Sequence, residues 1–169
     1  MALYLLPYFG NIDMSAIEDD YRIKAKIGER EIRLDINFNT KSANEATMNR
    51  IKKFLESIEQ IDKLNQKHYR QDFKRKGETA EYIEMYLEEF SEEELANLAD
   101  RSKSLNNQRM QLLNKLELER VGMYPNEPQE DKYFGVFDYS IKIEGEYCNQ
   151  LLVVKTKDTG ELDHITWES

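Results

Sequence analysis

The stretch Asp20–Phe38, DYRIKAKIGEREIRLDINF, decides the fold because it alternates apolar and polar residues on both sides of one glycine. Apolar residues occupy every second position from 21 to 27 and again from 32 to 38. This period of two is typical of a strand that buries one face. Gly28 lies between the two runs, so the sequence predicts a β-hairpin with a short turn.

Outward from this hairpin toward the N-terminus, a further strand is predicted near Leu3–Tyr8, so residues 1–40 are expected to be β-structure. The apolar start carries no basic flank, and Pro7 interrupts it. A signal peptide needs a basic flank and a longer apolar core, and a membrane-spanning helix needs about 20 apolar residues. The single cysteine, Cys148, fits a reducing compartment. We therefore expect a bacterial cytoplasmic protein without membrane association.

Residues 42–121 are predicted to be helical. Ser42 and Glu45 have the spacing of a capping box, in which the hydroxyl and the carboxylate each accept a backbone amide. Apolar residues then recur at spacings of three and four, which is typical of a helix with one buried stripe. Gly77 is expected to end this first helix.

Two more helices follow in the prediction. Thr79 begins the second helix, and Ser91 with Glu94 forms another capping box that begins the third. The third helix is expected to end at Gly122, with a bend or break at residues 106–107, because both are asparagine and asparagine is a poor helix former.

Residues 123–132 are predicted to be a loop, and residues 133–168 return to β-structure. Strands followed by helices and then by strands indicate an α+β fold. We expect a mostly antiparallel sheet, built from the N- and C-terminal strands and packed against a central block of three or more helices. The 169 residues fit a single domain that spans 1–169.

The net charge of -9 is unevenly distributed. Residues 78–100 hold nine Asp and Glu and no Lys or Arg. Such a segment is either a solvated helix face or a surface that meets a basic protein partner. The candidate binding acids are Glu81, Glu84, Glu88, Glu92 and Glu93.

Residues 41–77 hold ten Lys and Arg against five Asp and Glu. Lys63, Lys67, Arg70 and Lys74 follow one another at helical spacing, so they share one helix face. This basic stripe either complements the helix dipole and the acidic segment beside it or contacts RNA through Lys63–Lys76. The overall acidic charge argues against general nucleic-acid binding.

Few residues suggest catalytic chemistry. The chain has no G-x-S-x-G motif and no glycine-rich phosphate loop, and we expect neither a cofactor nor a metal site. Asp138, His164 and Glu168 are the candidate catalytic residues of a hydrolase-type site between the sheet and the helices. Asp138 is expected to point away from Phe137 and Tyr139, since neighbouring strand residues face opposite sides.

Five short motifs occur in a recognisable order: PYFG at 7–10, VGMYP at 121–125, FDYSI at 137–141, LLVV at 151–154 and WES at 167–169. As a set they resemble an uncharacterised bacterial family, a domain of unknown function, over nearly the whole chain. That family has no assigned activity, so the resemblance implies no catalytic residue.

Small acidic bacterial proteins of this style are also similar to immunity proteins, which neutralise secreted toxins. From the segregated charge we predict a non-enzymatic protein-interaction module, immunity-like in role, that uses the acidic region of residues 81–94 or the exposed sheet face. The hydrolase and the RNA-contacting protein remain the alternatives.

Overall fold

The computed structural model describes residues 1–125 and 133–169, and within them it has an α+β fold built on a six-stranded mixed sheet. The hairpin predicted from Asp20–Phe38 is confirmed. It consists of β3 (Asp20–Ile27) and β4 (Arg30–Asn37), which pair antiparallel in continuous register. Gly28 adopts a φ of +62° in the turn between them, a conformation that glycine tolerates without strain.

The sheet joins strands from both ends of the chain in the order β10-β9-β6-β5-β4-β3. Every neighbouring pair is antiparallel except β4–β5, which is parallel. The remaining strands of the sheet are β5 (Glu117–Met123), β6 (Gly135–Ser140), β9 (Leu151–Thr156) and β10 (Leu162–Glu168). The expectation of a mostly antiparallel sheet is therefore correct, with one parallel pair where the two halves of the chain meet.

Two small hairpins lie outside this sheet. The first pairs β1 (Leu3–Leu6) with β2 (Gly10–Asp13), and the second pairs β7 (Lys142–Ile143) with β8 (Glu146–Tyr147). A strand near Leu3–Tyr8 was predicted correctly, whereas its partner β2 and the second hairpin were not predicted.

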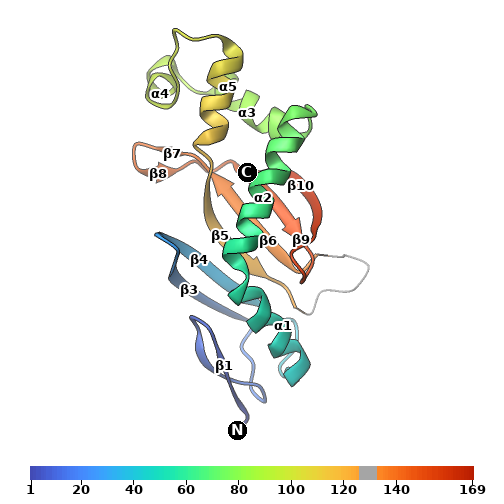
Figure 1. The fold of residues 1–169 in the computed structure, drawn as a ribbon. Coiled ribbons are helices and arrows are strands. Elements are labelled where there is room, and N and C mark those ends of the chain that lie inside the picture. Colours follow the sequence, from blue (N-terminus) through green and yellow to red (C-terminus); the bar gives the residue numbers. More distant parts are fainter. Residues whose placement is uncertain (126–132) are drawn as a thin grey trace.

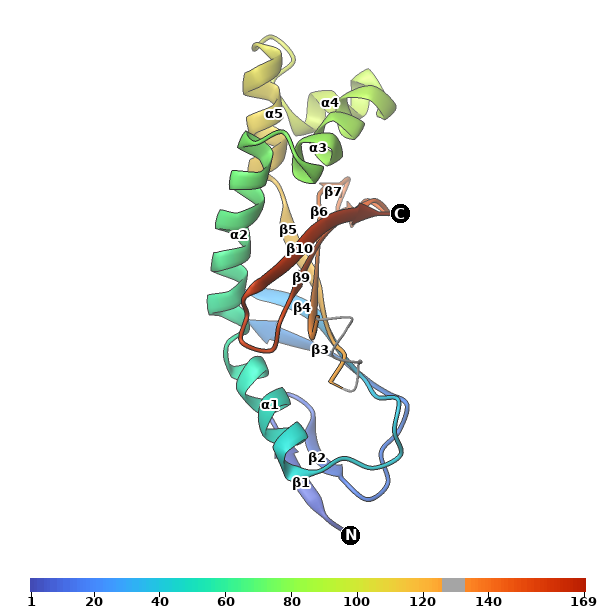
Figure 2. The same cartoon turned by 90° about the vertical axis from the view of Figure 1, so that its right-hand side faces the viewer.

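The helices divide into two groups (Figure 1, Figure 2). Their bounds are α1 (Glu45–Glu56), α2 (Ile58–Lys74), α3 (Glu78–Glu89), α4 (Glu92–Leu98) and α5 (Leu105–Asn114). Figures 1 and 2 show α2 running along one face of the sheet and α1 continuing it toward the β1–β2 hairpin, while α3, α4 and α5 gather at the opposite end, where α3 packs against β10. The sheet face that α1 and α2 leave open is called the open face below.

Much of the core lies between the sheet and the helices α1 and α2. Phe54 of α1 packs against Phe134 and Phe137, with ring centroids 5.0 and 5.9 Å apart. Tyr69 of α2 contacts the ring of Tyr139 at 5.3 Å. Each of these aromatic side chains is almost completely buried, so the contacts contribute several kcal/mol of apolar burial, at about 25 cal/mol per Å².

The start of the first helix differs from the prediction. Asn44, rather than Ser42, is the N-cap residue, and its side chain accepts a hydrogen bond from the backbone of Thr47 at 2.8 Å. The predicted capping box of Ser42 and Glu45 is therefore wrong. The helix predicted to end at Gly77 is also two helices, which meet at Ser57, where the backbone leaves helical geometry.

The end of the helical region differs from the prediction more than its start does. The third predicted helix stops at Leu98 and resumes only at Leu105, so the break precedes residues 106–107. Residues 117–121 were predicted to be helical, but they lie in β5, in the interior of the sheet. The predicted loop at 123–132 lies largely outside the described residues, which resume at Tyr133.

Replacing Ser91 tests the capping box of α4, which is confirmed: Ser91 Oγ accepts from Glu94 N, and Glu94 Oε1 accepts from Ser91 N, both at 3.1 Å. We expect Ser91→Ala to lower the free energy of unfolding by about 1 kcal/mol. Ser42→Ala, at the serine that does not cap, should change it by less than about 0.5 kcal/mol. Urea unfolding of both variants measures the difference, and equal losses would contradict the assignment.

Candidate functional site

A β-bulge in β5 places Arg120 on the open face. Leu118 pairs with Tyr139 and Arg120 pairs with Asp138, so Glu119 is an extra residue in β5. Leu118 belongs to the buried core, whereas Glu119 and Arg120 are both half-buried. A bulge re-aims side chains in this way, because the extra residue shifts the alternation of the strand by one position.

Arg120 bridges carboxylates on both neighbouring strands. Its Nε and Nη2 donate to Oδ1 and Oδ2 of Asp35 at 2.6 and 2.8 Å, and its Nη1 donates to Oδ2 of Asp138 at 3.1 Å. Nη2 also donates to the hydroxyl of Tyr124 at 2.9 Å, and Asn37 Nδ2 donates to Asp35 Oδ2 at 2.6 Å. Asp35 and Asp138 are 8% and 5% exposed, so both depend on Arg120 to offset the cost of a buried charge.

Burial and charge act in opposite directions on this network. Burial raises the pKa of Asp138, and the positive charge of Arg120 and its hydrogen bond oppose that rise. Burial also acts to lower the pKa of Arg120, but the hydrogen bond and the charge of Asp35 outweigh it and raise the pKa. Arg120 therefore stays protonated, and its charge and hydrogen bond favour the ionised form of Asp138 against the effect of burial.

Gly122 makes room for the guanidinium group of Arg120. A Cβ atom at this position would overlap Nη2 and Cζ of Arg120. The two residues lie on the same side of β5, two positions apart, so the side chain of Arg120 lies across the Gly122 backbone. Any larger residue at 122 would push Arg120 away from its carboxylates.

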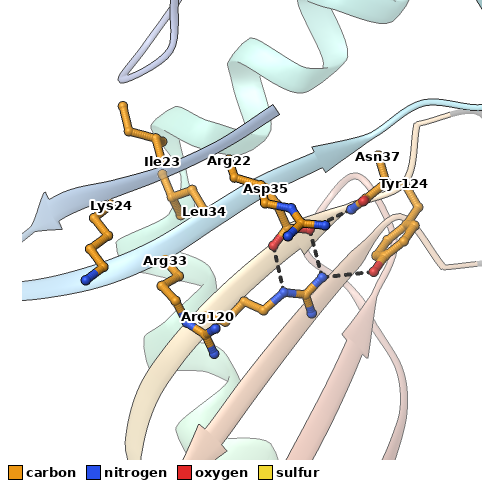
Figure 3. A pocket seen from close by; sticks show the side chains of 9 residues that line it. All are labelled: Arg22, Ile23, Lys24, Arg33, Leu34, Asp35, Asn37, Arg120 and Tyr124. Atoms are coloured by element: carbon orange, nitrogen blue, oxygen red, sulfur yellow. Dashed lines mark hydrogen bonds and ion pairs between the residues drawn. The ribbon is translucent and has the colours of Figure 1, made fainter. Parts of the chain in front are cut away.

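A cavity of about 660 Å³ opens beside this network (Figure 3). It is lined by Arg22, Ile23, Lys24, Arg33, Leu34, Asp35, Asn37, Arg120 and Tyr124, and we call it the Arg120 pocket. Four of these residues are cations, and one is a carboxylate. Figure 3 shows Asp35, Asn37 and Tyr124 joined to Arg120 by a continuous set of hydrogen bonds at one side of the pocket.

Asp138 faces away from its aromatic neighbours, as predicted. Phe137 and Tyr139 lie in the core, where the Tyr139 hydroxyl donates to Asp62 of α2 at 2.7 Å. Asp138 therefore lies on the open face, whereas the hydrolase hypothesis placed it between the sheet and the helices. Its partner there is Arg120, 18 residues away in sequence.

His164 and Glu168 do not join Asp138. Both belong to β10, and β9 lies between β10 and β6, the strand of Asp138. Neighbouring strands of a sheet are spaced by about 4.8 Å, so the backbones of β10 and β6 are about 10 Å apart. His164 Nδ1 shares a hydrogen bond with Asp163 at 2.5 Å, and both His164 and Glu168 are exposed. The structure does not bring the three residues together as an acid/base set.

The predicted acidic surface is partly neutralised by neighbouring helices and loops. Glu84 accepts from Arg109 of α5 at 2.8 Å, and Glu92 accepts from Arg101 at 2.9 Å. The hydrogen bond from Arg109 lowers the pKa of Glu84. The other predicted acids, Glu81, Glu88 and Glu93, are exposed, and no ion pair involves them in the described residues.

A groove of about 450 Å³ lies between the acidic helices and the β7–β8 hairpin. Glu89 ends α3, Glu94 lies in α4 and Glu146 begins β8, so three elements each supply one carboxylate to the lining. The lining also includes the half-buried side chains of Phe90 and Tyr147. No Lys or Arg is among its described lining residues. We call this the acidic groove.

The base of the acidic groove is held by a chain of aromatic contacts. Phe90 stacks on Tyr86 with ring centroids 5.0 Å apart, and the Tyr86 hydroxyl shares a hydrogen bond of 2.6 Å with the hydroxyl of Tyr82. Tyr82 in turn donates to the backbone carbonyl of Gln150 at 2.8 Å. Phe90 and Gln150, which both line the groove, are therefore fixed to the core.

The basic stripe lies along α2. Lys63, Lys67 and Lys74 are exposed, and Arg70 is half-buried and donates to Asn114 of α5 at 2.8 Å. Tyr69, which interleaves the stripe in sequence, is 1% exposed and packs in the core. A base of RNA could not stack on it, although such stacking is a common contribution to RNA recognition.

Sequence reasoning included Glu89 and Glu94 in its acidic region of residues 81–94 but missed other residues that build the two sites. Asp35 was one of several polar positions in a predicted strand, and Arg120 lay in a predicted helix. Glu146 lies in a hairpin that was not predicted. The local signals against a helix at Arg120 were Val121, which is β-branched, and Gly122, a poor helix former.

Comparisons of the chain with family models, with curated proteins and with solved structures found no match. This outcome agrees with the resemblance to an uncharacterised domain. Among the helices in residues 1–125 and 133–169, none is long and apolar enough to cross a lipid bilayer.

Proposed function

We propose that this protein is a non-enzymatic interaction module that binds a basic protein through the acidic groove. The observation that carries the proposal is the convergence of Glu89, Glu94 and Glu146 from three separate elements around half-buried aromatic side chains. Lys142 lies over the ring of Tyr147 at 5.0 Å, and Arg101 and Arg109 pair with Glu92 and Glu84, but none of these three cations is among the described residues that line the groove.

The chemistry of this groove suits an arginine or lysine that projects from a partner. The aliphatic stem of such a side chain packs on aromatic surface, while its charged end stays near carboxylates. Phe90 and Tyr147 supply aromatic surface, and Glu89 and Glu146 are exposed beside them. Charges that are complementary across an interface also raise the association rate and exclude acidic partners.

The biological role that we propose for this binding is immunity-like. Proteins that act on nucleic acid carry basic surfaces, and an acidic interaction protein of this kind neutralises such a protein by covering that surface. The proposal places the pair in the bacterial cytoplasm, where the single cysteine, Cys148, stays reduced.

Affinity capture from the native host tests the proposal when it is combined with charge reversal. The wild-type chain, the groove variant Glu89→Lys/Glu146→Lys and the control Glu18→Lys/Glu29→Lys are compared as baits; all four acids are exposed. We expect a basic protein that binds the wild type and the control, and binds the groove variant at least tenfold more weakly, or about 1.4 kcal/mol. Calorimetry with the purified partner measures the ratio.

Two results would overturn the proposal. One is a partner that binds the groove variant as tightly as the wild type, because its interface would then lie elsewhere. The other is the recovery of no protein partner in any growth state. Circular dichroism of the two charge-reversed variants shows that each keeps its fold before the binding results are compared.

A further inference from the structure

We propose that the Arg120 pocket binds an oxyanion with two or more negative charges, of the phosphate class. This site lies on the open face of the sheet, away from the acidic groove, and the inference does not depend on the proposed function. The pocket brings together Arg22 and Lys24 of β3, Arg33 of β4 and Arg120 of β5. Four cations from three adjacent strands therefore surround one cavity (Figure 3).

Two of these cations lie directly opposite each other on neighbouring strands. Lys24 pairs with Arg33 in the β3–β4 register, on the same face of the hairpin. Like charges at directly opposite positions destabilise a sheet. An anion bound between Lys24 and Arg33 would offset that repulsion. The pair therefore favours a negatively charged ligand.

The cations at the pocket retain unused hydrogen-bond donors. Within the described residues Lys24 has no ion pair, the ion pair of Arg33 runs from Nη2 to Glu119, and that of Arg22 runs from Nε to Asp20. The Arg22 and Asp20 side chains are 80% and 39% exposed, and a surface pair of this kind contributes little to stability. The remaining guanidinium and ammonium N–H groups can therefore bind an oxyanion while these weak pairs persist or open.

The carboxylate in the described lining of the pocket is already occupied by donors. Asp35 accepts two hydrogen bonds from Arg120, a cation it shares with Asp138, and one from Asn37, so its oxygens are engaged where it meets the cavity. Asp138, the second carboxylate on Arg120, does not line the pocket. Arg120 is thus a positioning residue, which suppresses the repulsion that Asp35 would exert on an anion.

The size of the cavity fits a multiply charged ligand. Its volume of about 660 Å³ lies within the range of about 300–1,000 Å³ that is usual for small-molecule pockets. It is larger than a single phosphate needs, and the cations lie along β3 and β4 rather than at one point. Two linked phosphoryl groups reach more of these donors than one, which favours pyrophosphate over inorganic phosphate.

Titration of the full chain with pyrophosphate tests the inference by NMR of the backbone amides. We expect saturable shifts in β3 and β4, and a Kd at least fivefold weaker in Lys24→Ala and in Arg33→Ala. Lys26→Ala is the matched control, because Lys26 is an exposed cation on the same strand and the same face but does not line the pocket. Its Kd should stay within twofold of the wild type.

Titrations with three other anions identify the class of anion that the pocket prefers. Citrate tests polycarboxylates, inorganic phosphate tests a single phosphoryl group, and acetate tests a single negative charge. Tighter binding of pyrophosphate than of citrate at equal ionic strength supports the phosphate class, and the reverse order overturns it. The groove variant Glu89→Lys/Glu146→Lys should bind pyrophosphate within twofold of the wild type, which separates this inference from the proposed function.

The inference fails on any of three results. The first is binding of pyrophosphate without saturation, as a diffuse surface charge would bind it. The second is a loss of affinity in Lys26→Ala as large as that in Lys24→Ala. The third is a mixed oligonucleotide that binds through Lys24 and Arg33 while pyrophosphate does not, which would identify the face as a nucleic-acid surface. Lys24 and Arg33 are exposed, so their alanine variants are expected to fold.

Discussion

Arg120→Met should lower the free energy of unfolding by about 3–5 kcal/mol at pH 7, because it leaves two buried carboxylates without their cation. Asp35 would lose both N–H donors of the bidentate pair, and Asp138 would lose its ion-pair partner. Methionine keeps much of the length of the side chain, so the loss reports charge and hydrogen bonding more than volume. Urea unfolding at pH 7 measures it.

The pH dependence of this loss has a definite sign. Burial raises the pKa of Asp138, and Arg120 is the group that opposes the rise. Without Arg120 the pKa rises further, so the folded variant takes up a proton more readily than the unfolded chain. Its stability therefore increases as the pH falls from 7 toward the pKa of an unfolded aspartate, about 3.9. The deficit relative to the wild type should be smaller at pH 5 than at pH 7.

Two further variants show whether the loss comes from the buried charges. Arg22→Met removes an arginine from the same face, but Arg22 is 80% exposed, so we expect a change within about 0.5 kcal/mol. Asp35→Asn in the Arg120→Met background should recover part of the loss, because it removes one unpaired charge. A deficit that is independent of pH and of Asp35 would contradict this role of Arg120.

Phe54→Ala should lower the free energy of unfolding by about 3–5 kcal/mol, the usual range for a buried phenylalanine. Phe54 is 1% exposed, and its ring joins α1 to the sheet through Phe134 and Phe137. Removal of the ring leaves a cavity where the first helix meets the sheet. Thermal or urea unfolding measures the loss.

A double-mutant cycle with Gly135 makes this prediction specific. A Cβ atom at Gly135 would overlap Cζ of Phe54 and lie 2.8 Å from Oγ1 of Thr156. Gly135→Ala alone should therefore cost about 1–3 kcal/mol through overpacking. In the Phe54→Ala background the added methyl group enters the cavity, so the double variant should be more stable than the sum of the two losses implies. Additive losses would contradict direct contact.

A surface leucine controls for a general sensitivity to truncation. Leu5 lies in β1 and is 67% exposed. Leu5→Ala should change the free energy of unfolding by no more than about 0.5 kcal/mol. A loss comparable to that of Phe54→Ala would show that the hairpin β1–β2 is more important for stability than its exposure indicates.

The elements predicted correctly were those whose local pattern and tertiary role agree. The β3–β4 hairpin alternates with a period of two because one of its faces is buried against the core. Ser91 caps α4 because a serine and a glutamate at this spacing satisfy each other's backbone amides where the chain enters a helix at the serine, which it does at Ser91 but not at Ser42. The orientation of Asp138 likewise followed from strand geometry alone.

The strand β5 was missed because its bulge hides its periodicity. Its core residues are Leu118, Val121 and Met123, so the first spacing is three rather than two. Glu117 and Arg120 are also good helix formers. The helix propensity of these residues therefore favoured a helix. In the folded protein the segment is a strand, because it pairs with β4 on one side and with β6 on the other.

By itself the sequence determined the α+β class, the alternation that builds the hairpin and the segregation of acidic from basic segments, because each is a property of neighbouring residues. Only the tertiary structure decided the two sites. Arg120 meets Asp35 across 85 residues, and the acidic groove needs a hairpin that follows its helices by about 50 positions. Such contacts depend on strand order, which no local pattern specifies, because the sheet inserts β5 between strands from both ends of the chain.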